Sequence, residues 1–262
     1  MRLRIISAAV LLPLVIIMLY LGGWWLFALL GLVLSIASWE YAELLKLIDL
    51  KPWYVALFLT CWLFLLDATF PDHSLLLPGL VLAVLIGSLW VLAKFSRGQQ
   101  NSIQRWALTI AGGVYLGLLG SHFLRLRALD NGFQWCLVAC GSTWIADSAA
   151  FWVGRAMGKN KLAPTISPGK TWEGYLGGIL FGTPLAAVLA WALKLDPMHG
   201  AVVGLLVAAI SPIGDLLVSM IKRQAGSKDS GKLIPGHGGF LDRIDSLLIS
   251  VTLATYYVGW IA

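Results

Sequence analysis

The feature that most constrains this chain is a series of apolar runs, each about 20 residues long, which is the length a helix needs to cross the hydrocarbon core of a bilayer. Apolar residues make up 59% of the 262 residues and charged residues only 12%, whereas soluble domains carry roughly 25% charged residues. No polar stretch is long enough to form a separate soluble domain. The sequence therefore predicts an all-α, polytopic integral membrane protein.

About nine runs meet this length. The candidate spans are residues 5–21, 24–39, 53–70, 75–94, 105–124, 133–153, 174–194, 200–219 and 246–261. Arg2 and Arg4 before the first run are also typical of a signal peptide. That run is long, however, and has no clear small-x-small cleavage site, so we interpret it as a retained span.

The distribution of basic residues predicts the topology. With nine spans and a cytoplasmic N-terminus, all but three of the 19 Lys and Arg residues fall on the cytoplasmic side, the exceptions being Arg125, Arg127 and Lys194. Cytoplasmic loops carry such an excess. We therefore expect the C-terminus on the opposite side, and the polar loops 154–173 and 220–245 both in the cytoplasm. The N-terminal helices comprise residues 1–125, and residues 126–262 form a C-terminal region with both loops.

The net charge of +6 does not point to nucleic acid, because the basic residues lie in short loops. Such loops suit anionic lipid head groups or nucleotide phosphates.

The densest polar block begins at Asp215, near the cytoplasmic end of the eighth predicted span and just after Pro212. An aspartate at this depth is costly, and such residues usually face an interior cavity and carry function. Asp215, Ser219 and Lys222 follow the spacing i, i+4, i+7 and share one helical face. The alternative is an Asp–Lys pair that only stabilises the helix.

Asp242 and Asp245 lie three residues apart at the start of the last span, so they also share a face. Two adjacent carboxylates repel each other unless a cation lies between them. With Asp215 they form an oxygen-only ligand set without zinc-type Cys or His spacing, which favours Mg²⁺ or a similarly hard ion. The alternative is that the charges complement a helix dipole, which explains one aspartate better than three.

The residues between these aspartates are suited to anions. Gly238 and Gly239 can bring backbone N–H groups close to a phosphate, although glycines also form ordinary turns. The adjacent His237 is as consistent with a structural role as with donation to a phosphate. Positive charge comes from Lys222, Arg223, Lys228 and Lys232, and part of it is explained by topology alone.

A second polar set starts at Asp147, inside the sixth predicted span. The loop after it is basic and rich in hydroxyl groups, with Lys161, Ser167, Lys170, Thr171 and Glu173. Such a loop suits a nucleotide phosphate chain.

The two polar sets together suggest phosphoryl or nucleotidyl transfer at the membrane surface. Cations would offset the repulsion between two anionic substrates, and positioning with electrostatic stabilisation would do most of the catalytic work. A phosphate monoester, with a second pKa of about 6, is largely ionised at neutral pH. Such a nucleophile needs no dedicated general base.

The stretch SMIKRQAGSKDSGKLIPGHGGFLDRID, from Ser219 to Asp245, resembles the signature of phosphatidate cytidylyltransferases (CDP-diacylglycerol synthases). The matching positions are Ser219, Lys222, Arg223, Lys228, Asp229, Pro235, His237, Gly238, Gly239, Asp242, Arg243 and Asp245. The segment from Ser167 to Gly174 resembles a second block of the family. The resemblance covers the chain from about Asp147 onward, and the first half is similar only in being hydrophobic.

The resemblance implies that CTP and phosphatidic acid give CDP-diacylglycerol and pyrophosphate in phospholipid biosynthesis. By analogy Asp215, Asp242 and Asp245 would bind Mg²⁺, and the number of cations stays open. Lys222, Arg223 and Lys228 would contact phosphates, and Lys222 and the three aspartates would be catalytic. The compact chain is similar to bacterial members, which implies the inner membrane, a cytoplasmic active site and a homodimer. Substrate binding is expected of Asp147, Lys161, Ser167, Lys170, Thr171, Glu173, Ser219, Arg223, Lys228, Asp229, His237, Gly238, Gly239 and Arg243.

Three other functions are alternatives to this one. A transporter would use Asp147 and Asp215 for ion coupling, but it leaves the dense loop 220–245 unexplained. A CDP-alcohol phosphotransferase would show a repeated aspartate motif that is absent from this sequence. A structural scaffold has no use for buried aspartates.

Overall fold

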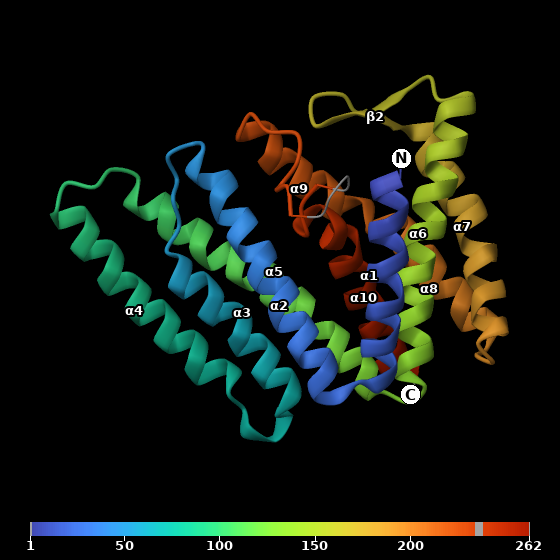
Figure 1. Cartoon of the computed structure of the whole chain (residues 1–262), viewed down its shortest axis with the longest axis horizontal. Coiled ribbons are helices and arrows are strands. Elements are labelled where there is room, and N and C mark those ends of the chain that lie inside the picture. The colour runs from blue at the N-terminus through green and yellow to red at the C-terminus, as the bar shows by residue number, and fades with distance from the viewer. Residues whose placement is uncertain (1, 234–237, 262) are drawn as a thin grey trace. The chain divides into compact units, whose positions relative to one another are not determined.

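In the computed structural model, residues 2–233 and 238–261 are described, and they are mostly helical (Figure 1). The chain divides into two compact units. The first comprises Met1–Leu124 and Gln224–Asp242, and the second comprises Arg125–Arg223 and Arg243–Ala262. The helices are α1 (Arg2–Leu21), α2 (Gly23–Lys46), α3 (Tyr54–Thr69), α4 (Leu76–Ser96), α5 (Ser102–Ala128), α6 (Gly132–Met157), α7 (Trp172–Ala192), α8 (Pro197–Ile210), α9 (Pro212–Gln224) and α10 (Leu241–Ile261).

The helices confirm the prediction of an all-α polytopic membrane protein. Within residues 2–233 and 238–261, seven helical segments are long and apolar enough to cross a bilayer, and two shorter apolar stretches, Leu11–Leu21 within α1 and Tyr54–Thr69, fall below that length. The exposed apolar side chains of α4 indicate what surrounds this helix. Leu77, Leu89 and Phe95 are each more than two-thirds exposed. An apolar surface of this kind suits lipid rather than water.

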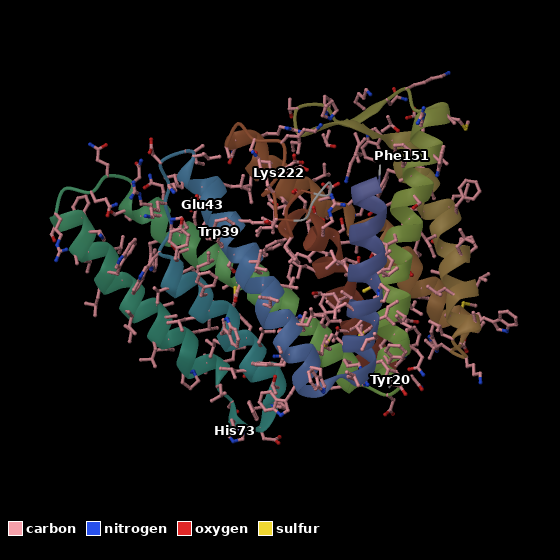
Figure 2. All side chains as sticks on the ribbon, in the orientation of Figure 1. Tyr20, Trp39, Glu43, His73, Phe151 and Lys222 are labelled. Atoms are coloured by element: carbon pink, nitrogen blue, oxygen red, sulfur yellow. The ribbon has the colours of Figure 1, made fainter. Side chains whose placement is uncertain are left out.

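In the first unit, the helices are joined by side-chain bonds to the main chain and by close approaches. The Tyr41 hydroxyl on α2 donates to the Leu108 carbonyl on α5 at 3.0 Å. The Trp53 N–H before α3 donates to Thr109 Oγ1 at 3.0 Å. Gly117 brings α5 against α3, since a Cβ there would lie 2.8 Å from the Cα atom of Cys61. A short 3₁₀ helix, η1 (Pro71–His73), connects α3 to α4, and Figure 2 labels its His73.

In the second unit, α6, α7 and α8 pack against one another through small residues. A Cβ on Gly182 of α7 would lie 3.2 Å from the Cβ of Ala146 on α6. A Cβ on Gly204 of α8 would collide with the side chain of Ala186 on α7. Small residues let membrane helices approach closely in this way. Figure 1 shows these three helices side by side.

The predicted loop 154–173 contains a β-hairpin that the sequence did not suggest. Strands β1 (Lys161–Ala163) and β2 (Ser167–Thr171) pair antiparallel, with Lys161 opposite Thr171. The strands are short, and Thr171 is the only β-branched residue in them, while Ser, Pro, Gly and Lys fill the rest of β2. Pairing with the neighbouring segment therefore forms this hairpin against its local propensity.

The predicted eighth span, 200–219, consists of two consecutive helices. α8 ends at Ile210 and α9 begins at Pro212, with Ser211 between them. Proline has no N–H for the helix ladder but fits the first position of a new helix. The break therefore places Asp215 in the first turn of α9.

Candidate active site

The first group of predicted site residues lies in the second unit, where α6, β2 and α9 contribute to one polar cluster. Lys170 Nζ forms an ion pair with Asp215 Oδ2 at 2.6 Å. Ser219 Oγ, one turn along α9, donates to Asp215 Oδ1 at 3.0 Å. Asp147 on α6 is exposed and interacts electrostatically with both Lys170 and Asp215. We call these four residues the aspartate–lysine cluster.

The hairpin places Lys170 in this cluster. Polar side chains in and around the hairpin hold it in place. Thr171 caps α7 by accepting the Gly174 N–H at 3.1 Å. Glu173 accepts from the Asn160 side chain at 2.8 Å and from its main-chain N–H. Arg223 Nε on α9 donates to the Ile166 carbonyl in the β-turn at 3.1 Å. These three side chains thus hold the hairpin, and their predicted substrate contacts stay a prediction.

The predicted metal ligands Asp215 and Asp245 lie on two helices, α9 and α10, that are in contact. A Cβ atom on Gly214 would collide with the main-chain carbonyl oxygen of Asp245, so α9 meets α10 without any side chain between them. Asp245 is buried, and its Oδ1 accepts the Ser246 N–H at 2.7 Å. Lys222, also buried, lies two turns after Asp215 on α9 (Figure 2). Glycine at position 214 therefore brings Asp215 and Asp245 to neighbouring positions.

The second group lies in the first unit, in the segment that connects α9 to α10. We call residues 225–233 and 238–240 the signature loop. Three donors meet Asp242 Oδ2. They are the Ser230 N–H at 2.8 Å, the Ser230 hydroxyl at 2.9 Å and the Gly239 N–H at 3.2 Å. Gly238 has a φ of +82°, a left-handed conformation that glycine adopts without steric cost. The glycines thus turn the chain around the Asp242 carboxylate.

The signature loop and the end of α2 border a cavity whose lining combines charged residues and serines with Leu44 and Leu47. Its lining includes the charged side chains of Glu43, Lys228, Asp229 and Lys232 together with the Ser227 and Ser230 residues. Figure 2 shows Glu43 near the end of α2. Lys228, Asp229 and Lys232 are exposed. Ammonium and hydroxyl groups of this kind suit a phosphate ligand.

The remaining predicted site residues have varied surroundings. Lys161 is exposed on β1 and Ser167 is half-buried on β2. Arg243 is exposed in the first turn of α10. His237 lies outside the described residues.

The donor atoms of the three aspartates suit a hard cation, because all are carboxylate oxygens. A cation already pairs with one of them, since the Lys170 ammonium lies on Asp215. Among residues 2–233 and 238–261, however, no three His, Cys, Asp or Glu side chains converge closely enough to hold a metal ion. The chemistry of the ligands thus fits Mg²⁺, while a ready three-carboxylate site is not formed in this part of the chain.

Reasoning from the sequence missed two polar residues of the first unit, Glu40 and Ser230. Both are buried and bonded to each other, with Ser230 Oγ 3.0 Å from Glu40 Oε2. Glu40 had a signal of its own, because this acidic residue directly follows the predicted span 24–39 and lies within α2, and acidic residues are rare in membrane helices unless they have a role. Ser230 had none, since serine is common in loops.

Comparison with known proteins extends the resemblance to the whole chain. The sequence pattern of the cytidylyltransferase family matches residues 2–261. A protein of Haemophilus influenzae named phosphatidate cytidylyltransferase is 37% identical, over 97% of this chain and 97% of its own length. Proteins of the same name from Pseudomonas aeruginosa and Synechocystis sp. are 37% and 34% identical, over 98% and 97% of this chain and 97% and 95% of their own lengths.

Proposed function

Because the chain belongs to the cytidylyltransferase family, as its signature predicted, we propose that it is a phosphatidate cytidylyltransferase of phospholipid biosynthesis. It condenses CTP with phosphatidic acid to give CDP-diacylglycerol and pyrophosphate. The observation that carries this proposal is the similarity of full-length relatives with that name at 34–37% identity. The aspartate–lysine cluster supports it.

The reaction exchanges one phosphoanhydride bond for another. An oxygen of the phosphatidate monoester attacks the α-phosphorus of CTP, and the bond from that phosphorus to the oxygen bridging to the β-phosphate breaks. Pyrophosphate leaves with that electron pair. The monoester is largely dianionic near neutral pH, so the nucleophile needs no proton acceptor from the protein.

The protein's task is to bring two polyanions together. Lys170 is held at the cluster by Asp215, and Lys228 and Lys232 line the cavity of the signature loop. We assign Lys170, Lys222 and Lys228 to substrate phosphates, where fixed positive charge stabilises the charge that develops on the bridging and non-bridging oxygens. The transporter alternative offers no role for these lysines.

We further propose that Mg²⁺ binds through Asp215, Asp242 and Asp245. When bound, it would neutralise phosphate charge and act as a Lewis acid at the phosphoryl oxygens. The support is the oxygen-only ligand set and the contact between α9 and α10 at Gly214. Chelation with EDTA should abolish turnover, and added Mg²⁺ should restore it. Full activity in EDTA would refute this assignment.

The location follows from topology. The charge distribution of the loops supports an active site on the cytoplasmic face of a bacterial inner membrane, where CTP is available. We also propose a homodimer, on the resemblance alone. Nucleic acid is not among the proposed partners.

The proposed reaction is tested by measuring pyrophosphate release from CTP by the purified protein. Release should require both phosphatidic acid and Mg²⁺. Release without phosphatidic acid, or none with all three present and the protein folded, would contradict it.

A further inference from the structure

A carboxylate from the N-terminal half of the chain holds the signature loop. Glu40 on α2 is fully buried, with 0% of its surface exposed, and it is separated from Ser230 by 190 residues in sequence. Glutamate is almost never fully buried unless its charge has partners. The partners of Glu40 therefore explain why the residue lies there.

All three described hydrogen bonds of Glu40 come from the signature loop and the start of α10. Oε1 accepts the Phe240 N–H at 3.1 Å. Oε2 accepts the Leu241 N–H at 2.9 Å and lies 3.0 Å from the Ser230 hydroxyl. The first N–H groups of a helix have no acceptor within the helix, and a negative charge is favourable at that end. Glu40 thus caps α10 from a distant part of the chain.

One hydroxyl links Glu40 to a predicted catalytic aspartate. Ser230 Oγ lies 3.0 Å from Glu40 Oε2 and 2.9 Å from Asp242 Oδ2. The main-chain N–H of Ser230 also donates to the Asp242 carboxylate. The position of the Asp242 carboxylate is therefore coupled to Glu40 through a single residue.

Two glycines of the same segment leave room for the Glu40 carboxylate. A Cβ atom on Gly231 would collide with Glu40 Oε1, and a Cβ on Gly239 would collide with Glu40 Oε2 and with Ser230 Oγ. The loop sequence is thus fitted to an acidic side chain on α2. A loop that only met an apolar helix would not need this space.

We propose that Glu40 is a positioning residue, which fixes the signature loop and orients Asp242 through Ser230. The consequence for turnover rests on the proposed function, whereas the anchoring of the loop does not. Substitutions of groups that orient such carboxylates typically cost about 10- to 100-fold in activity or metal affinity.

The test uses Glu40→Gln in the full-length protein, purified in detergent micelles. Glutamine keeps the size of the side chain but replaces one acceptor oxygen by an N–H donor. At least one main-chain N–H at Phe240 or Leu241 then loses its acceptor. The fraction of molecules in which the loop is open should therefore rise about fivefold or more.

The control variant is Asp67→Asn in the same unit. Asp67 is also a buried carboxylate, and its Oδ1 accepts the Leu76 N–H at the start of α4 at 3.1 Å. It is therefore matched to Glu40 in burial and in helix capping, but it does not touch the signature loop in any described contact.

Loop opening is read from tryptic cleavage after Lys232, which is exposed in the signature loop. Cleavage after Arg97, exposed between α4 and α5, is the internal reference. In Glu40→Gln, cleavage after Lys232 should rise about fivefold or more relative to cleavage after Arg97. In Asp67→Asn this ratio should stay at the wild-type value. Mass spectrometry of the digest measures both.

The second readout separates kcat from KM. Glu40→Gln should lower kcat about 10- to 100-fold at a melting temperature no lower than that of Asp67→Asn. Unchanged cleavage after Lys232, equally faster cleavage at both sites, or a wild-type kcat would each overturn the positioning role. If the wild-type protein shows no turnover, the proposed function fails, and the cleavage ratio still decides whether Glu40 anchors the loop.

If Glu40→Gln does not fold, Ser230→Ala serves in its place. It removes the hydroxyl bridge and leaves both main-chain bonds of Glu40 intact. The kcat should then fall while the melting temperature changes little. A wild-type kcat in Ser230→Ala would overturn the link to Asp242.

Discussion

At the scale of single residues, the aspartate–lysine cluster contains one pairing of opposite charges. Asp215 and Lys170 are both partly accessible, with 34% and 25% of their side chains exposed. Partly exposed ion pairs contribute at most about 1 kcal/mol to folding. The contribution of the pair to folding is therefore small, and its proposed role is to place positive charge beside the substrate phosphates.

Asp215→Asn should lower kcat by about 10²- to 10³-fold, the typical cost of losing an electrostatic group that stabilises a transition state. Asparagine keeps the size of the side chain but removes the charge that holds Lys170. Steady-state kinetics with CTP and phosphatidic acid measures the effect.

The matched control for this prediction is Asp196→Asn. Asp196 caps α8 in the same unit by accepting the Met198 N–H at 2.7 Å, and asparagine caps helices about as well. Its kcat should stay at the wild-type level. The assignment of Asp215 would be wrong if both variants retained wild-type rates and melting temperatures.

At the scale of elements, the contact between α9 and α10 brings two aspartates together. Gly214→Ala places a methyl group against the Asp245 carbonyl oxygen. Overpacking of this kind typically costs about 1–3 kcal/mol, and it moves Asp215 away from Asp245. We expect a lower melting temperature together with a lower kcat.

Gly259→Ala is the control, on the neighbouring helix α10. A Cβ there would make only an ordinary contact, 3.9 Å from the Leu129 side chain. Its melting temperature should equal or exceed that of the wild type, since alanine has the higher helix propensity. If Gly214→Ala kept the melting temperature and the kcat of the wild type, close contact of α9 and α10 would not be needed, and the prediction would be wrong.

The sequence predicted the helices well and the loops poorly, for reasons visible in particular elements. Apolar runs give α4 and α10 because hydropathy alone decides them. The hairpin at Lys161–Thr171 escaped prediction because its strands are short and Thr171 is the only strand-forming residue in them. The division between α8 and α9 lies at Pro212, a helix-breaking residue inside a run that hydropathy alone predicts as one span.

In the site, too, the sequence predicts contacts between neighbouring residues but not contacts between distant ones. The spacing of Asp215 and Ser219 predicted a shared helical face, and the bond between them confirms it. Glu40 and Ser230 meet across 190 residues, so no local pattern announces their contact. Gly231 and Gly239 leave room for the Glu40 carboxylate, but in the sequence they look like ordinary turn residues.

At the scale of the whole molecule, the odd number of predicted spans determines where the ends of the chain lie. The positive-inside rule places the N-terminus in the cytoplasm, and nine spans then place the C-terminus outside it. A reporter fused after Ala262 should be active on the non-cytoplasmic side. A cytoplasmic signal would mean that the span count is wrong by one.

The chain-long match to the cytidylyltransferase family makes transfer of the CMP group the central claim. The most direct measurement follows two labels, one on the α-phosphate of CTP and one on the γ-phosphate, in mixtures with phosphatidic acid and Mg²⁺. The α-label should enter the lipid fraction, and the γ-label should stay in the aqueous fraction, where it passes from CTP to pyrophosphate. A γ-label in the lipid, or no label there at all with the protein folded, would contradict nucleotidyl transfer.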